Sequence, residues 1–396
     1  MGAIVRWGRA IFAKTNQRPP YFYFYLYKLP ISGIINSKHF ITMKKILISM
    51  LAIAGFAVAQ AQVDNEVSTA TLVHGDQTTV FKGVNALIMA YNAAADTLDV
   101  ITLSPGSFNP PENIQKSITI RGAGFEGDST KRITRTRVGG RVQITPGEGK
   151  NINGIRIEGI RCQNLTLAGD QNTPAAQQAH DLVINKCYVE DRINLLSVAH
   201  DVTISQSYVH GEVSGRHSDY TNYVNVDNLQ LFNCNVGGLD RFLNNETTFS
   251  NIMVNHCIIR VMNCSYNSSI GPWVYYNSII RGNPPSGSTV RGCVLINVNN
   301  LNNNVDGEAN YFGKQIADVL ADGSDKLDYF VNDVPHSLAV KDEFVGIDNT
   351  PVGVFGGIMP WNPIPSLPRI IDFKTTVSDD NKTLHVDIEA DIPSYP

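Results

Sequence analysis

One short pattern occurs six times between Leu182 and Leu295, and it constrains the fold more than any other feature of the chain. Each copy has two apolar residues separated by one residue, then two mostly polar residues, a Cys or Ser, and an apolar residue two places further on. The alternation predicts a β-strand, and the polar pair predicts a bend. The copies are Leu182–Val189, Val202–Val209, Leu229–Val236, Ile252–Ile259, Trp273–Ile280 and Ser288–Leu295, of which only the last breaks the rule at its first position.

The Cys or Ser of each copy marks its place in the repeat. Neighbouring markers lie 15 to 27 residues apart, and a constant pattern with variable spacing predicts turns of one coil whose loops differ in length. A strand-based coil of this size is a parallel β-helix, in which each strand pairs with its equivalent one turn away at about 4.8 Å. We therefore expect an all-β solenoid whose interior contains the stacked markers Cys187, Ser207, Cys234, Cys257, Ser278 and Cys293.

The cysteines predict buried free thiols. Four of the six Cys are markers, and aligned stacking keeps Cys234 and Cys257 from closing a disulfide easily. No Cys-x-x-Cys pair or Cys/His cluster indicates a metal or redox site, so we expect none.

The start of the chain predicts export. Met43–Ala61 has a basic start, a short apolar run and small residues in an A-x-A arrangement, as in a secretory signal peptide. Residues 1–42 contain no Asp or Glu, and we interpret them as an upstream extension from an early start codon, although a genuine leader is an alternative. No later segment is long and apolar enough to span a membrane. A periplasmic, cell-surface or extracellular location all agree with these features.

Charge excludes one class of partner. The first 61 residues contain eight of the 32 Lys and Arg and none of the 36 Asp and Glu, so the remainder has a net charge of about −12. This acidity argues against binding to nucleic acid and against unaided binding of polyanions.

The rest of the chain divides by pattern. Residues 62–304 are expected to form the coil, with an amphipathic helix at Phe81–Ala95 covering its first turn. Residues 305–369 become rich in Gly and Pro and predict an irregular strap or linker. Residues 370–396 contain two alternating runs that predict a β-hairpin, which either closes the last coil or serves as a docking tag.

The opening coils carry a family resemblance. Asp99–Asn109 reads D-V-I-T-L-S-P-G-S-F-N and Lys116–Phe125 reads K-S-I-T-I-R-G-A-G-F. Together with the preceding helix, they resemble the pectin-lyase-like superfamily of right-handed parallel β-helices, and the whole most resembles secreted β-helix proteins of Bacteroidetes-type bacteria. The superfamily includes lyases, glycoside hydrolases and non-catalytic surface proteins, so the resemblance implies the fold and leaves the activity open.

An outward stripe is the candidate site. Residues three places after the markers should point outward on successive coils, and they include Glu190, His210 and Arg260. Arg192 and Glu212 lie two places further on. The loop Gly211–Tyr223 leaves the coil beside this stripe. Long loops on a rigid scaffold are where such proteins place binding surfaces. The loop contributes the further candidate binding residues Arg216, His217, Asp219, Tyr220 and Tyr223.

The stripe supports two hypotheses. A polysaccharide lyase needs a cation near the carboxylate of a uronate and a base that removes the adjacent C5 proton. Arg192 or Arg260 is the candidate cation, and His210 is the candidate base. Ca²⁺ is expected as a possible cofactor only if the protein is a lyase. Tyr188 and Tyr208 share one outward column that suits stacking on sugar rings. The Asp clusters and glycine-flanked His of the superfamily's pectate lyases and polygalacturonases are missing. We therefore expect an exported protein that presents a lateral surface to glycans or cell-envelope partners without catalysis. The alternative is a polysaccharide lyase or glycoside hydrolase, and a third interpretation is a solvated face of cross-strand ion pairs.

Overall fold

The computed structural model describes residues 68–95, 97–127, 135–147, 152–168, 178–215, 226–240, 242, 251–262, 273–302, 304–365, 369–377 and 384–391. Contacts divide the chain into two units, Met1–Asn65 and Glu66–Pro396. The expected upstream extension and signal peptide lie outside the described residues. Within the described part, no helix is long and apolar enough to cross a membrane.

One long sheet, sheet A, runs through the second unit. Its strands pair in parallel from β3 onward, whereas β1 pairs antiparallel with both β2 and β3. The order is β2 (Gln77–Lys82), β1 (Thr69–His74), β3 (Thr97–Leu103), β5 (Ser117–Arg121), β7 (Arg156–Glu158), β10 (Val183–Asn185), β13 (Val198–Ser205), β15 (Val226–Phe232), β17 (Ile252–Asn255), β19 (Val274–Tyr276), β21 (Thr289–Arg291) and β23 (Asp306–Glu308), with β9 (Gln178–His180) beside β13.

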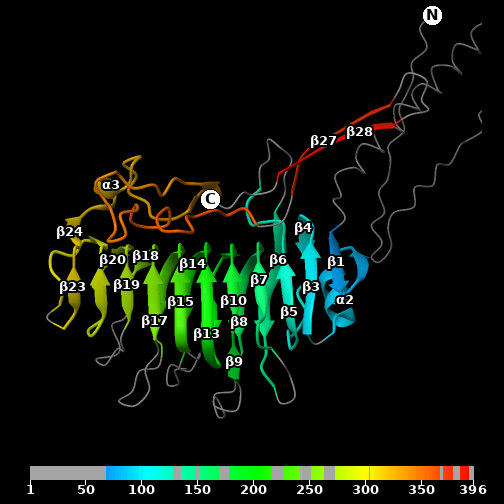
Figure 1. Cartoon of the computed structure of the whole chain (residues 1–396), viewed down its shortest axis with the longest axis horizontal. Helices are drawn as coiled ribbons and strands as arrows, with labels where there is room; N and C mark the ends of the chain where they lie inside the picture. The colour runs from blue at the N-terminus through cyan, green and yellow to red at the C-terminus, as the bar shows by residue number, and fades with distance from the viewer. Residues whose placement is uncertain are drawn as a thin grey trace, which may run out of the picture. The chain divides into compact units, whose positions relative to one another are not determined.

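A second long sheet, sheet B, is parallel in each pairing described. Its order is β4 (Gly106–Phe108), β6 (Thr136–Ile144), β8 (Arg161–Leu167), β11 (Tyr188–Val189), β14 (Tyr208–Ser214), β16 (Asn235–Asp240), β18 (Ile258–Val261), β20 (Ile279–Arg281), β22 (Val294–Ile296) and β24 (Tyr311–Lys314), with β12 (Ile193–Leu195) beside β8 and β14. Along the chain, strands of the two sheets alternate, and each pairs with its equivalent one coil away (Figure 1). This arrangement is compatible with a parallel β-helix.

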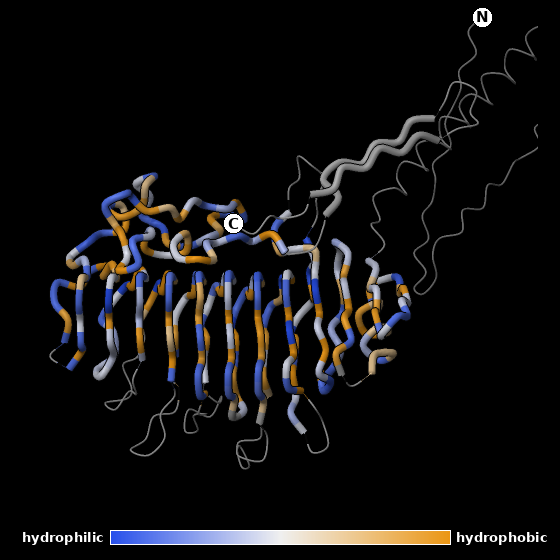
Figure 2. The backbone as a smooth tube through the Cα atoms, in the orientation of Figure 1, coloured by the Kyte–Doolittle hydropathy of each residue, from blue (hydrophilic) through white to orange (hydrophobic). Residues whose placement is uncertain are grey.

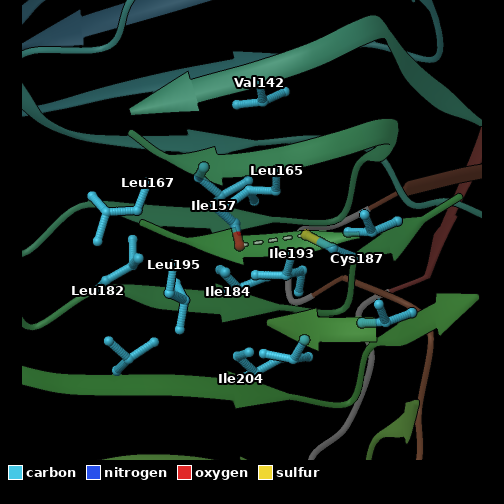
Figure 3. Close-up of a cluster of buried hydrophobic side chains, with 14 of the residues drawn as sticks. Val142, Ile157, Leu165, Leu167, Leu182, Ile184, Cys187, Ile193, Leu195 and Ile204 are labelled. Atoms are coloured by element: carbon cyan, nitrogen blue, oxygen red, sulfur yellow. Dashed lines mark hydrogen bonds between the residues drawn. The ribbon is translucent and has the colours of Figure 1, made fainter. Parts of the chain in front are cut away.

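The strand register confirms the predicted repeat alignment. The second apolar residue of each copy pairs with its equivalent through the whole series Ile184, Ile204, Leu231, Val254, Tyr275 and Val290. These side chains are fully buried. In Figure 3, Ile157, Ile184 and Ile204 come from successive coils around Cys187 and form part of the continuous interior. Hydrophobic and polar residues alternate along the stacked strands in Figure 2, as a wall with one buried face requires.

The marker column explains why Cys and Ser interchange. Each marker side chain donates to the carbonyl oxygen two residues earlier, as in Cys187 Sγ to Asn185 O (3.2 Å) and Ser207 Oγ to Ser205 O (2.7 Å). Marker amides also donate to the next marker's side chain, as in Cys187 N to Ser207 Oγ (3.1 Å) and Cys257 N to Ser278 Oγ (3.0 Å). Cys and Ser can therefore replace each other at these six markers, because both have a small side chain that donates and accepts.

The prediction of buried free thiols is confirmed for Cys162, Cys187, Cys234, Cys257 and Cys293. Burial raises the pKa of Cys187 and Cys293 to about 12. Cys264 lies outside the described residues.

The predicted N-terminal helix is shorter than expected. Helix α2 covers Ala86–Ala93, whereas Phe81 belongs to strand β2. Gly83 separates them with a φ of +94°, a conformation that a helix cannot contain. Leu87 and Tyr91 are buried against the core, whereas Val84, which lies before the helix, is half exposed.

The coil continues beyond the predicted end at residue 304, because β23 and β24 pair with β21 and β22. Residues 315–365, here called the C-terminal segment, contain little regular structure, as predicted for the Gly- and Pro-rich residues 305–369. They include α3 (Ile316–Val319) and the short antiparallel pair β25 (Phe330–Val331) and β26 (Val334–Pro335). Beyond them, β27 (Arg369–Val377) and β28 (Leu384–Asp391) pair antiparallel where the sequence predicts a hairpin.

The C-terminal segment is bonded to the bends between the two sheets. The residue before each of five markers has a left-handed backbone, with φ between +45° and +51°, at Lys186, Gln206, Asn233, His256 and Asn277. The side chains of all five bond to the segment, and their contacts follow it in reverse order from Ile364 to Ile347. The segment therefore runs antiparallel to the coil order along one corner of the stack (Figure 1).

Candidate functional site

A single column of side chains runs along the outer face of sheet B, and we call it the outer column. In register order it contains Arg137, Arg161, Tyr188, Tyr208, Asn235, Ile258, Ile279, Val294 and Tyr311. From Tyr188 to Tyr311 the column is mostly apolar, and it packs with C-terminal segment residues such as Leu327, Tyr329 and Trp361 in a cluster separate from the coil interior. At Arg161 and Arg137 the column becomes cationic.

Arg137 and Arg161 lie around the carboxylate of Glu190, and together with Arg135, whose charge interacts with both, they form an arginine cluster. Arg161 Nε lies 2.6 Å from Glu190 Oε1, and Arg137 Nη2 lies 3.5 Å from the same oxygen. Asp333 is a more distant counter-charge, with Oδ1 3.8 Å from Arg161 Nη2. Two guanidinium groups thus share the Glu190 carboxylate, and Arg135 adds a third positive charge that interacts with both.

The cluster has unused capacity for an anion. Arg161 Nη1 is buried without a hydrogen-bond partner among the described residues. Partial burial, together with the positive charges of Arg161 and Arg137, lowers the pKa of Arg135. The side chain of Arg137 is 55% exposed, so a ligand can reach it from solvent. A carboxylate or sulfate placed here would relieve repulsion among the arginines and accept paired N–H bonds.

The predicted stripe is stacked as the spacing indicates. Glu190, His210 and Arg260 each directly follow residues that pair between neighbouring coils, in the series Val189, Val209, Val236 and Ile259. Arg192 and Glu212 also meet, with Arg192 Nε 3.7 Å from Glu212 Oε2. His210 is exposed, and its pKa is lowered by partial burial and by the charge of Arg260.

Arg260 is not exposed on this stripe, and that part of the prediction is wrong. Its side chain is buried, forms an ion pair with Asp328, and donates from Nη2 to Val209 O (2.9 Å) and to His210 O. Its guanidinium lies 5.2 Å from the ring centre of Tyr208. Desolvation lowers the pKa of Arg260. The C-terminal segment supplies Asp328 and closes this part of the surface.

Tyr188 and Tyr208 are neighbours on adjacent coils, as predicted, with ring centres 4.8 Å apart. The expected exposed ladder is nevertheless wrong, because both side chains are buried. Phe330 stacks on Tyr188 with ring centres 5.1 Å apart and an interplanar angle of 24°, and Tyr329 meets Tyr208 edge-on. Burial raises the pKa of both tyrosines.

The remaining predicted binding residues, Arg216, His217, Asp219, Tyr220 and Tyr223, lie outside the described residues. In the described ranges, no group of three or more His, Cys, Asp or Glu is placed to hold a metal ion.

The sequence prediction missed the arginine cluster. The register shows that Ile155–Cys162 is a further copy of the repeat, with Ile160 at the marker position and Arg161 in the outer column. A search that required Cys or Ser at the marker could not find this copy. The chain matches no protein-family model, no curated protein and no solved structure.

Proposed function

We propose that the protein is an exported right-handed parallel β-helix of the pectin-lyase-like type, which binds anionic glycans on the outer face of sheet B without catalysing a reaction. In this proposal α2 covers the first coil and the C-terminal segment is a strap over the rest of that face. The stacked parallel sheets, the opening sequence motifs and the Met43–Ala61 pattern support these parts of the proposal.

The arginine cluster is the observation that carries the proposal. Arg137 and Arg161 lie at the end of the column that the C-terminal segment covers and share the Glu190 carboxylate, and Arg135 adds a third positive charge. Arginine binds carboxylate and sulfate groups through paired donors, which fits the acidic groups of a polysaccharide.

Charge adds selectivity to this surface. Past residue 61 the chain has a net charge of about −12, so a local cluster of arginines is an exception on a surface that repels polyanions. A glycan with spaced acidic groups can contact the cluster locally, whereas a densely charged nucleic acid meets repulsion from the rest of the molecule.

A binding panel tests the proposal. The chain from residue 62 is titrated with polygalacturonate, alginate, chondroitin sulfate and the neutral polymer dextran. We expect binding to at least one acidic polymer and none to dextran. In the double variant Arg137→Gln, Arg161→Gln we expect affinity to fall about tenfold to a hundredfold, since each charge-assisted contact contributes about 1.5–3 kcal/mol and part of this is retained by Gln.

Arg291→Gln is the matched control. Arg291 lies on sheet A, is partly exposed and pairs with Asp306 and Glu308, so its loss removes a comparable charge from another face. Circular dichroism verifies that each variant is folded. Absence of binding to every acidic polymer, or equal losses in the control and the double variant, would refute the proposal.

The lyase alternative is supported by one observation. His210 is exposed and its lowered pKa keeps the imidazole neutral at neutral pH, which is the form that a general base requires. The buried ion pair with Asp328 makes Arg260 a poor partner for a substrate carboxylate, which leaves Arg192 for that role. Absorbance of an unsaturated product on the same acidic polymers, lost in His210→Ala, would establish the lyase and reject the non-catalytic proposal.

A further inference from the structure

The β25–β26 hairpin covers the next position in the outer column after the arginine cluster. We call residues 330–334 the hairpin tip. Within it, Phe330 stacks on Tyr188 and Asp333 lies 3.8 Å from Arg161. The guanidinium of Arg161 itself lies 4.5 Å from the ring centre of Tyr188. The tip thus places one flat ring and one carboxylate on the two outer-column residues that follow Arg137.

The same combination of groups would come from one residue of an acidic glycan. A sugar ring presents a flat face to a tyrosine, and its acidic group presents oxygen atoms to an arginine. We propose that the hairpin tip is an internal competitor, which occupies the continuation of the glycan surface from Arg161 onto Tyr188 and is displaced when a longer acidic glycan binds. This inference rests on the proposed function and adds its regulation.

The tip is built as a small separate unit. Its two strands pair only with each other and belong to neither long sheet. Asn332 and Asp333 have φ values of +53° and +61°, the conformation of a two-residue turn that closes a hairpin locally. The side chain of Asp333 is 76% exposed, and Val334 is 63% exposed. Displacement of the tip therefore costs mainly the ring contacts of Phe330, which packs against Phe125, Tyr188, Tyr208 and Tyr329.

The base of the hairpin is held more firmly, which defines the limit of the movement. Leu327 and Tyr329 are buried. Asn235 Nδ2 donates to Leu327 O at 2.7 Å, and Tyr329 bonds to Glu126. Asp328 pairs with the buried Arg260. We expect the base to stay in place while the tip moves, so that Tyr188 becomes accessible and Tyr208 stays covered.

The fit of the tip on Arg161 is incomplete. Asp333 Oδ1 lies beyond hydrogen-bond distance of Arg161 Nη2, and Arg161 Nη1 lacks a partner among the described residues. A glycan carboxylate that satisfies both nitrogen atoms would bind better than Asp333 does. Only molecules with a displaced tip can bind the longer glycan, so the apparent affinity equals the intrinsic affinity multiplied by the fraction of open molecules. The competitor therefore weakens binding without abolishing it.

Two variants of the tip test the inference. Phe330→Ala removes the ring that covers Tyr188, and Asp333→Asn removes the internal carboxylate. With the acidic polymer of the panel that the unmodified chain binds best, we expect each variant to bind about fivefold more tightly, because the open state becomes more populated. Asp191→Asn is the control for charge alone, since Asp191 is exposed near Arg192 and does not belong to the tip.

Hydrogen exchange provides a second readout. Bound glycan should speed the exchange of the amides of Val331, Asn332 and Asp333, because their hairpin is displaced. Slower exchange at these amides, unchanged or weaker binding by Phe330→Ala, or an equal gain in Asp191→Asn and Asp333→Asn would overturn the inference. If the unmodified chain binds an acidic polymer and the double variant Arg137→Gln, Arg161→Gln does not, the proposed function stands, and any of these three results rejects only the inference that the tip is a competitor. If no acidic polymer binds the unmodified chain, the proposed function fails and the competitor with it.

Discussion

Asn233 allows a quantitative test of how the C-terminal segment is held on the coil. The side chain is buried, and Nδ2 donates to Val354 O at 2.9 Å and to Gly356 O at 2.8 Å. Its φ is +50°, a left-handed conformation that Asn tolerates. Asn233→Ala therefore loses two buried hydrogen bonds and retains an unfavourable backbone conformation.

The expected loss follows from these two parts. Two hydrogen bonds contribute about 1–3 kcal/mol together to the free energy of unfolding. A left-handed conformation costs Ala about 1–2 kcal/mol, whereas Gly adopts it freely. We therefore expect Asn233→Ala to lower the free energy of unfolding by about 2–5 kcal/mol and Asn233→Gly by about 1–3 kcal/mol.

Asn297 provides the matched control, because it has a φ of +60° and an exposed side chain. Asn297→Ala should lose only the backbone part, about 1–2 kcal/mol. Urea unfolding followed by circular dichroism measures all three variants in the chain from residue 62. The account of the segment is refuted if Asn233→Ala costs no more than Asn297→Ala.

Three further predictions concern the interior and the covered surface. Cys257→Ser should change the free energy of unfolding by less than about 1 kcal/mol, because Ser already occupies two of the equivalent markers. Cys257→Val removes the acceptor of Cys234 N and should lower the free energy of unfolding by about 1–3 kcal/mol. Thermal denaturation measures both variants. The raised pKa of Cys187 and Cys293, about 12 against 9.0 for the free thiol, means that the folded state holds these protons more tightly. The stability this provides is fully present below pH 9 and is lost as pH rises toward 12, so the urea midpoint should fall between pH 8 and pH 11, and it should fall less in Cys187→Ser, Cys293→Ser. Arg260→Ala removes the donor of two carbonyls and the ion-pair partner of Asp328, whose side chain is 37% exposed and also accepts from the Tyr208 hydroxyl. It should cost about 1–3 kcal/mol in urea unfolding, and a loss below about 0.5 kcal/mol would show that these bonds do not form in solution.

The repeat was predictable because its signal is local. Alternation around Ile184 and the Cys or Ser three residues later specify both the strand and the inward direction, and the register of the paired strands agrees with that alignment. The expected start of the helix at Phe81 failed for an equally local reason, since Gly83 interrupts the apolar pattern with a positive φ.

The cover over sheet B was harder to predict because it is not local. Tyr188, Ile258 and Ile279 are outward residues of strands, and their apolar character indicates that another part of the chain packs on them. The covering residues, such as Tyr329, follow in sequence only after the coil is complete. The sequence pattern alone left a sugar contact open for the tyrosines, because nothing in it links these distant segments.

The most direct test of the proposed anionic-glycan surface compares one oligosaccharide with and without its charge. Isothermal titration of the chain from residue 62 with a hexauronate oligosaccharide and with its neutral methyl ester isolates the contribution of the carboxylates. The arginine cluster predicts binding of the acid, weakened by added salt and by Arg137→Gln, Arg161→Gln, and little binding of the ester. Equal affinity for the two forms, or binding of the acid that is insensitive to the double substitution, would contradict the account.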